Sequence, residues 1–334
     1  MKARNPLRGA LWFAVALAIA APAEAQLFRA YLSTSGNDAN PCTLPQPCRL
    51  LPAALAAVAS GGEVWLLDSA NYNTATVEIS KSVTILAVPG AVGSVVATGG
   101  PAISIGTAGV NVVLRNLVIV PLPGAGGTIG INMTAGSSLA VDGSLIANMV
   151  DSCIKVSGDI SVHLTATTVR SCGNYGLRIA SGASASVTGS VFSGSSMGIY
   201  VVANSPSSSV SAEIADSTFD ANNAGVVVHA FDATGTATAS LHQCRLVRNS
   251  YGGYATSNAD GQASIAVGDS LVSGNETGII AVNGGASAWL AGSTVSHNGI
   301  GLHNNGTLFE SAGNNAVRRN GTDTLGTITV IPPK

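Results

Sequence analysis

Three long side chains recur at one position of a sequence repeat and could bind an acidic ligand. Lys155, Arg178 and Tyr200 lie 23 and 22 residues apart, and Tyr175 precedes Arg178 by three residues. Copies of a repeat of this length stack, so we expect these side chains on one outer face, about 4.8 Å apart. Cations beside an aromatic ring can hold an anionic polymer by charge and stacking. The alternative is that they are ordinary exposed side chains that shield a sheet.

A second set of polar residues offers acid–base chemistry. His163 and Glu213 fall in one outward row of the repeat, whereas His229, Asp232 and Asp260 fall in or beside loops that lengthen three successive copies. A carboxyl group and an imidazole within reach of one substrate could act as general acid and base. A polar loop cluster without a catalytic role explains the same residues, and we favour that interpretation.

These residues are positioned by a short phrase that recurs from about residue 141 to residue 320. Each copy fits apolar-x-x-(Ser/Thr/Cys)-x-apolar, and most continue with Asn or a small residue and then Gly-apolar-x-apolar. A unit of this length cannot bury its apolar face alone, so neighbouring copies must stack. The central residues are 22 to 27 residues apart: Ser144, Thr167, Ser190, Ser217, Cys244, Ser270, Ser293 and Asn315.

The repeat predicts an all-β protein, a single right-handed parallel β-helix of about nine or ten coils. Residues 48–59 are rich in Leu and Ala and predict a short helix that covers the unpaired edges at the N-terminal end. We divide the folded chain into a first strand and cap (26–62), coils (63–320) and a C-terminal cap (321–334). Five asparagines are expected to form a side-chain ladder at one turn: Asn222, Asn249, Asn275, Asn298 and Asn320.

The first 25 residues are typical of a cleaved export signal. Lys2, Arg4 and Arg8 form a basic start, an apolar run covers residues 10–20, and a small-x-small cleavage site ends at Ala25. The apolar run is shorter than the roughly 20 residues that span a bilayer. We therefore expect a secreted or periplasmic protein with no membrane span after cleavage.

The charge balance argues against nucleic acid as a partner. Cleavage removes three of the 15 basic and one of the 17 acidic residues, which leaves a formal net charge of −4. Binding to nucleic acid depends on many contacts between Lys or Arg and phosphate. Charged residues make up only 10% of the chain and aromatic residues 4%, so a chemically rich active site is not expected.

The five cysteines suggest an oxidising compartment. Cys42 and Cys48 flank a short loop with two prolines, and we expect a disulfide there rather than half of a metal site. Cys244 replaces the Ser or Thr of other copies and is expected to be buried. Cys153 and Cys172 occupy neighbouring coils, and their pairing stays open.

The repeats, together with a helix before a Gly-Gly-Glu-Val strand at residues 61–64, resemble the right-handed parallel β-helix proteins of the pectate-lyase-like superfamily. The resemblance covers nearly all of the chain after residue 25. It implies an elongated exported protein, often with polysaccharide contacts along a lateral cleft. Members include pectate lyases, polygalacturonases, alginate epimerases, phage tailspikes and adhesins, so the resemblance alone does not select an activity.

The enzymatic motifs of that superfamily do not recur in this chain. The Asn-Thr-Asp, Asp-Asp, Gly-His-Gly and Arg-Ile-Lys motifs of polygalacturonase-like enzymes are missing from the sequence. Asp216 and Asp269 share an outward row, but two coils separate them by roughly 10 Å, too far to share one calcium ion. We expect neither a metal nor another cofactor.

These observations favour an exported β-helix that binds polysaccharide or another cell-surface partner without catalysis. One alternative is a polysaccharide lyase, glycoside hydrolase or epimerase that acts on glycans containing uronate. A second alternative is a structural or adhesive solenoid. The expected contact residues are Lys155, Arg178, Tyr200 and Tyr175.

Overall fold

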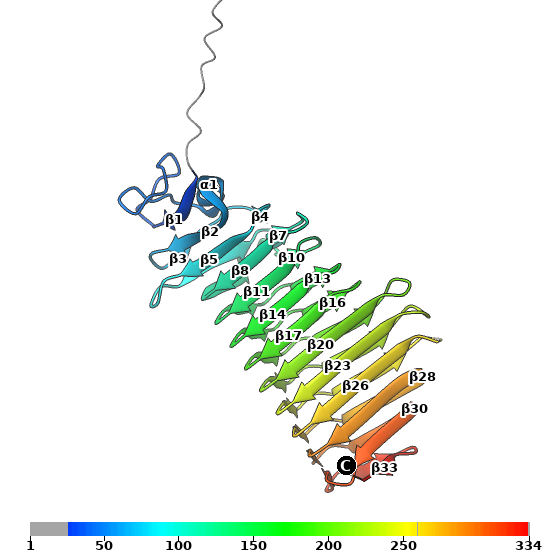
Figure 1. Cartoon of the computed structure of the whole chain (residues 1–334). Coiled ribbons are helices and arrows are strands. Elements are labelled where there is room, and N and C mark those ends of the chain that lie inside the picture. The colour runs from blue at the N-terminus through cyan, green and yellow to red at the C-terminus, as the bar shows by residue number, and fades with distance from the viewer. Residues whose placement is uncertain (1–25, 259, 333–334) are drawn as a thin grey trace, which may run out of the picture.

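The computed structural model describes residues 26–258 and 260–332, which form a solenoid of parallel strands (Figure 1). It has about 11 turns, slightly more than the nine or ten predicted, and residues 70–121 contribute strands although the repeat phrase is not recognisable there. At roughly 4.8 Å per turn, the solenoid is about 50 Å long. The predicted export signal lies outside the described residues. No helix in the described part of the chain is long and apolar enough to cross a membrane.

Each turn adds one strand to each of three stacks, named A, B and C in chain order. Stack A contains β1 (Leu27–Leu32), β2 (Val58–Leu66), β5 (Val83–Ala87), β8 (Asn111–Arg115), β11 (Ser138–Asp142), β14 (Ser161–Thr165), β17 (Ser184–Thr188), β20 (Ser209–Ala215), β23 (Thr236–His242), β26 (Gln262–Gly268) and β33 (Thr329–Ile331).

Stack B contains β3 (Ala70–Asn71), β6 (Gly93–Ala97), β9 (Leu117–Pro121), β12 (Leu145–Ala147), β15 (Thr168–Arg170), β18 (Val191–Ser193), β21 (Thr218–Asp220), β24 (Arg245–Val247), β27 (Leu271–Ser273), β29 (Thr294–Ser296) and β31 (Ala316–Val317). Stack C contains β4 (Val77–Ile79), β7 (Pro101–Ile105), β10 (Ile129–Met133), β13 (Ser152–Ser157), β16 (Tyr175–Ala180), β19 (Met197–Ala203), β22 (Ala224–Ala230), β25 (Tyr251–Ser257) and β32 (Thr322–Leu325). The long strands β28 (Thr277–Ala291) and β30 (Ile300–Ala312) bend and belong to both C and A.

Alternate residues of each strand point into the solenoid and form continuous apolar rows. The rings of Phe192 and Phe219, on adjacent coils of stack B, are stacked with centroids 5.2 Å apart. Val187, Ile214 and Leu241 form an inner row of stack A and are buried. Burying such a side chain stabilises the fold by about 1.5 to 3 kcal/mol, so the inward rows hold the coils in register and direct the intervening residues outward.

The predicted asparagine ladder is confirmed at the turn between stacks B and C. The backbone N–H and the Nδ2 of Asn222 donate to Oδ1 of Asn249 at 2.9 and 3.2 Å, and Nδ2 also donates to the carbonyl of Phe192. The same contacts repeat from Asn249 through Asn275 and Asn298. The ladder satisfies backbone groups that would otherwise be buried without a partner.

Two turn positions in each repeat copy from Ser144 to Ser293 have a left-handed backbone. One precedes the central residue of the repeat and the other lies four residues after it. Glycine fills several of these positions, for example Gly189 with a φ of 59°. Ala166 and Ala221 also adopt this conformation, with φ of 47° and 53°, although a Cβ atom makes it costly.

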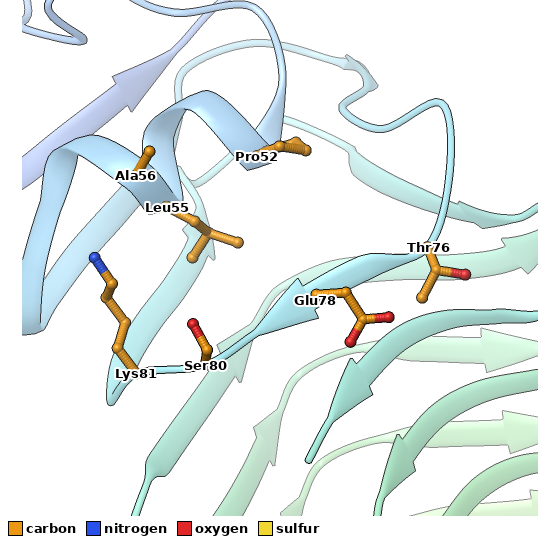
Figure 2. Close-up of a pocket in the computed structure, with 7 residues that line it drawn as sticks. All are labelled: Pro52, Leu55, Ala56, Thr76, Glu78, Ser80 and Lys81. Atoms are coloured by element: carbon orange, nitrogen blue, oxygen red, sulfur yellow. The ribbon is translucent and has the colours of Figure 1, made fainter. Parts of the chain in front are cut away.

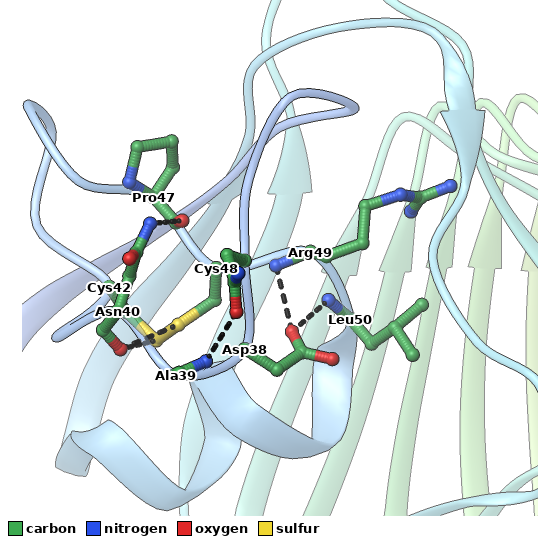
Figure 3. The surroundings of a disulfide bond; sticks show 9 residues. Asp38, Ala39, Asn40, Cys42, Pro47, Cys48, Arg49 and Leu50 are labelled. Carbon is green, nitrogen blue, oxygen red and sulfur yellow. Dashed lines mark hydrogen bonds between the residues drawn. A yellow bond between two sulfur atoms is a disulfide. The ribbon is translucent and has the colours of Figure 1, made fainter.

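The N-terminal end is covered as predicted. Helix α1 (Leu51–Ala57) begins after Leu50, and β2 follows it directly at Val58, so the helix ends earlier than the Gly-Gly pair suggested. Cys42 and Cys48 form the expected disulfide, with Cα atoms 4.6 Å apart. Oδ1 of Asp38 accepts hydrogen bonds from the backbone N–H groups that precede the helix (Figure 3). The disulfide and this carboxylate tie the first loop to the cap.

A second disulfide joins Cys153 to Cys172 on the next coil, with Cα atoms 5.6 Å apart. Cys153 lies opposite Gly176 in the following strand of stack C. Cys172 occupies the position that Asn222 and its successors take in later coils, because its N–H donates to Ser195, whose N–H donates to Asn222. At this turn the disulfide therefore takes the place of the side-chain hydrogen bonds that asparagines make in later coils. Cys244 is buried and unpaired, as expected.

Candidate functional site

The outward face of stack C brings the predicted contact residues together. Lys155 pairs in register with Arg178, and Arg178 pairs with Tyr200. Neighbouring strands lie about 4.8 Å apart, so the two cationic side chains start one strand spacing apart on the same face. We call Lys155 and Arg178 the cationic pair. The outward row is Glu78, Ser104, Asn132, Lys155, Arg178, Tyr200, Val227, Tyr254, Ile280, His303 and Leu325.

The cationic pair has no acidic partner in the described structure. Neither side chain forms an ion pair or a side-chain hydrogen bond with a described residue, and both are only half-buried. By contrast, Arg29 lies 2.7 Å from Glu63 and Arg115 lies 3.8 Å from Asp142. Two unneutralised charges side by side repel each other, and an anion placed between them would relieve that repulsion.

Tyr200 has aromatic neighbours on both sides. Its ring is stacked on that of Tyr175, with centroids 5.1 Å apart and an interplanar angle of 9°. On the next coil His229 lies 6.1 Å away, and its Nδ1 is 2.8 Å from the hydroxyl of Tyr200. One face of the ring is thus covered by Tyr175 and its hydroxyl is engaged by His229, so Tyr200 is less open to a ligand than the sequence pattern suggested.

Burial alters the titration of this aromatic cluster. It raises the pKa of Tyr200 to about 12, an effect to which Tyr175 adds and which Arg178 opposes. Burial also lowers the pKa of His229, and the hydrogen bond from its Nε2 to Oδ1 of Asn258 only partly offsets that effect. Near pH 7 the phenol is therefore protonated and the imidazole uncharged.

Phe231, which sequence reasoning missed, is the exposed aromatic residue of this region. It follows β22 directly, packs edge-on against His229 with centroids 5.4 Å apart, and is 57% exposed. An apolar residue at the first position of a polar loop is the sequence signal that could have identified it. Phe231 can offer a sugar the apolar surface that Tyr200 lacks.

The three long loops lie side by side along one edge of the solenoid (Figure 1). Backbone hydrogen bonds connect them, from Phe231 to the carbonyl of Ala203 and from Gln262 to that of Gly235. Asp232 accepts bonds from the backbone N–H and the hydroxyl of Thr234, and both contacts lower its pKa. The carboxylate of Asp232 is therefore engaged in its own turn, while Asp260 is exposed.

The structure divides the predicted acid–base residues between two places. His163 and Glu213 lie in one outward row of stack A, two coils apart with Ser186 between them. No hydrogen bond or ion pair between described residues links either of them to the loop residues. His242 is the histidine that lies one coil from Glu213, and sequence reasoning overlooked it. Counting two residues back from Cys244 in the repeat would have placed it there.

The start of the stack C row lies beside the cap. A hollow of about 410 Å³ separates α1 from β4 and is lined by Pro52, Leu55, Glu78 and Lys81 among others (Figure 2). Nζ of Lys81 donates to the carbonyl of Val58 at 2.9 Å. Since Glu78 begins the row, the cationic pair lies within the face and not at its end. Among the described residues no cluster of His, Cys, Asp or Glu could hold a metal ion.

Comparison with known proteins agrees with this architecture. The family model described as a right-handed beta helix region matches residues 68–213 and 129–300. The chain belongs to this family. No curated protein matches this β-helix protein in sequence.

Several solved structures share the fold of this β-helix protein. One is the A-module of a mannuronan C-5 epimerase from Azotobacter vinelandii, with 12% identity, a TM-score of 0.59, and coverage of 81% of this chain and 86% of the other. XylC in complex with xylose has 7% identity and a TM-score of 0.55, with coverage of 84% of this chain and 70% of the other. A pectate lyase has 14% identity and a TM-score of 0.51, with coverage of 93% of this chain and 79% of the other. At such low identity the similarity concerns the fold.

Proposed function

We propose that this β-helix protein is exported and binds an acidic polysaccharide along the outward face of stack C, without catalysis. The observation that carries the proposal is the cationic pair, two adjacent charges in register without an acidic partner among the described residues. An anionic polymer could contact both charges at once, because its own charges repeat along its length. The two disulfides support export, since such bonds persist in oxidising compartments.

The surroundings of the cationic pair favour a polymer over a small ion. The face is open and continues through Asn132 on one side and the Tyr175–Tyr200 stack on the other. Two of the proteins that share the fold are named for the acidic polysaccharides pectate and mannuronan. On the stack C face, the carboxylate of Asp232 is engaged in its own turn and Glu213 lies on another stack, which favours binding over catalysis at this site, because acid–base chemistry needs both groups at one bond.

Binding to polygalacturonate and alginate tests the proposal, with dextran as the uncharged control. Lys155→Ala/Arg178→Ala should weaken binding about tenfold or more, because hydrogen bonds to charged groups contribute about 1.5 to 3 kcal/mol each. Added salt should weaken the wild-type complex, since exposed charges are screened over about 8 Å at physiological ionic strength.

The matched control is Arg170→Ala/Arg245→Ala, which removes two exposed charges from stack B. This variant should bind as the wild type does. Equal affinities for the wild type and the Lys155/Arg178 variant would exclude the stack C face. Absence of binding to both acidic polymers would instead favour a structural or adhesive solenoid.

A further inference from the structure

A second hollow lies on stack A, away from the cationic pair. It has a volume of about 250 Å³ and crosses β17, β20 and β23. The residues that line it include Ser186, Thr188, Glu213, Ala215, Ser240 and His242. Register explains the arrangement: Ser186, Glu213 and Ser240 form one outward row, and Thr188, Ala215 and His242 form the next.

His242 is oriented by a carboxylate outside the hollow. Its Nδ1 lies 3.4 Å from Oδ2 of Asp269, which follows the next strand of the stack. A carboxylate beside one ring nitrogen favours the proton on that nitrogen. In the uncharged ring Nε2 is then left as a hydrogen-bond acceptor.

The other polar groups of the hollow have free hydrogen-bonding capacity. The side chains of Glu213, Ser240, Ser186 and Thr188 form no hydrogen bond with a described residue, although the backbone carbonyl of Thr188 accepts one from the hydroxyl of Ser190. The floor between them is the methyl group of Ala215. A small apolar floor surrounded by one carboxylate, an imidazole and three hydroxyls is complementary to a ring that carries several hydroxyls and an apolar C–H face.

We propose that this hollow binds one ring of a neutral sugar. Glu213 accepts hydrogen bonds from two neighbouring ring hydroxyls, His242 accepts one through Nε2, and Ser240 or Thr188 completes the contact. An anionic sugar is disfavoured because Glu213 and Asp269 both carry negative charge nearby. A divalent cation is disfavoured too, because these two carboxylates belong to strands two coils apart, roughly 10 Å. The site does not depend on the cationic pair.

Nuclear magnetic resonance of the full protein with isotope-labelled histidine rings tests this site. The probes are glucose, galactose, mannose and xylose, and a His242→Gln variant assigns the His242 signal. At least one probe should shift that signal saturably, with a Kd on the order of 1 mM. Glu213→Gln should weaken this binding about tenfold, since it removes the charged acceptor while keeping the shape of the side chain.

Glu310→Gln is the matched control, because Glu310 belongs to the same outward row on β30 but lies outside the hollow. It should leave the sugar-induced shift unchanged. The proposal is overturned if no neutral probe shifts the His242 signal, if Glu213→Gln binds as the wild type does, or if only methylammonium, a cationic probe, produces the shift. Thermal melting of each variant confirms that it is folded.

Discussion

Single residues in the turns carry local strain that the rest of the coil offsets. Ala166 and Gly189 occupy the same left-handed turn position on adjacent coils, with φ of 47° and 59°. The conformation costs an alanine about 1 to 2 kcal/mol, whereas glycine adopts it freely but loses more entropy on folding. The same turn position is therefore strained in the coil that has Ala166 and unstrained in the coil that has Gly189.

Ala166→Gly should stabilise the protein by about 0.5 to 1 kcal/mol, which is the relieved strain less the added entropy of the unfolded chain. Gly189→Ala is the matched reverse change, and it should destabilise by a similar amount because no atom near Gly189 would clash with a Cβ. Urea denaturation measures both effects. A loss of stability in Ala166→Gly would show that the backbone there is not strained.

The half-buried histidine beside Tyr200 makes stability depend on pH. Because burial lowers the pKa of His229 below 6.5, the unfolded chain binds its proton more readily than the folded one. The contribution of His229 is thus full above about pH 6.5 and is lost as the pH falls from there through the folded pKa. His229→Gln should therefore reduce the fall in Tm between about pH 7 and about pH 5.

The control for this experiment is His163→Gln, which removes an exposed imidazole without touching Tyr200. Its melting profile should follow that of the wild type. If His229→Gln lost as much stability on acidification as the wild type does, another group would be responsible.

Among the elements, the turn between stacks B and C has the most regular contacts. Each asparagine of the ladder satisfies groups of the preceding coil. The Cys153–Cys172 disulfide occupies the corresponding place earlier in the chain, before the asparagines begin. The turn is thus held covalently in one part of the solenoid and by hydrogen bonds in the other.

Asn249→Ala should destabilise the protein by at least about 2 kcal/mol, because it leaves buried donors of Asn222 and the carbonyl of Phe219 without partners. Asn223 directly follows Asn222 in the turn one coil before Asn249. It is exposed and provides the control. Asn223→Ala should change stability by less than about 0.5 kcal/mol. Equal effects of the two substitutions in chemical denaturation would argue against the ladder as a source of stability.

For the whole molecule, the two ends of the solenoid differ. Helix α1 and the first disulfide cover the N-terminal end, whereas β33 at the other end is exposed, with Val330 71% accessible. Unpaired strands are templates for association. An uncovered N-terminal coil could add its parallel strands to the C-terminal end of another copy, and such a head-to-tail contact does not close on itself.

Deletion of residues 26–57 should therefore produce oligomers whose size grows with protein concentration. Sedimentation velocity measures this, with the full folded chain as the reference under the same conditions. A variant that sediments as the intact protein does at every concentration would show that the cap has no role in preventing association.

The short loop between Cys42 and Cys48 determined the first disulfide. The repeat determined the parallel β-helix, the asparagine ladder and the register of Lys155, Arg178 and Tyr200. These features depend on residue type at a fixed position in a coil, which alternation and the central residue of each copy define. The contribution of the cationic pair to binding stays a prediction. The structure has about 11 coils, close to the nine or ten that the repeat and the strands predicted before it indicated.

Only the tertiary structure decided what surrounds each outward side chain. The contacts of Tyr200 with Tyr175 and His229, the Cys153–Cys172 bond and the hollow between Glu213 and His242 each combine positions from two or three coils. Loops of unequal length change the number of residues that separates neighbours on adjacent coils. The direction of each side chain then determines which of these neighbours it contacts. The pattern within one coil specifies neither the sequence separation of such neighbours nor the direction of their side chains, whereas the stacking of the coils determines both.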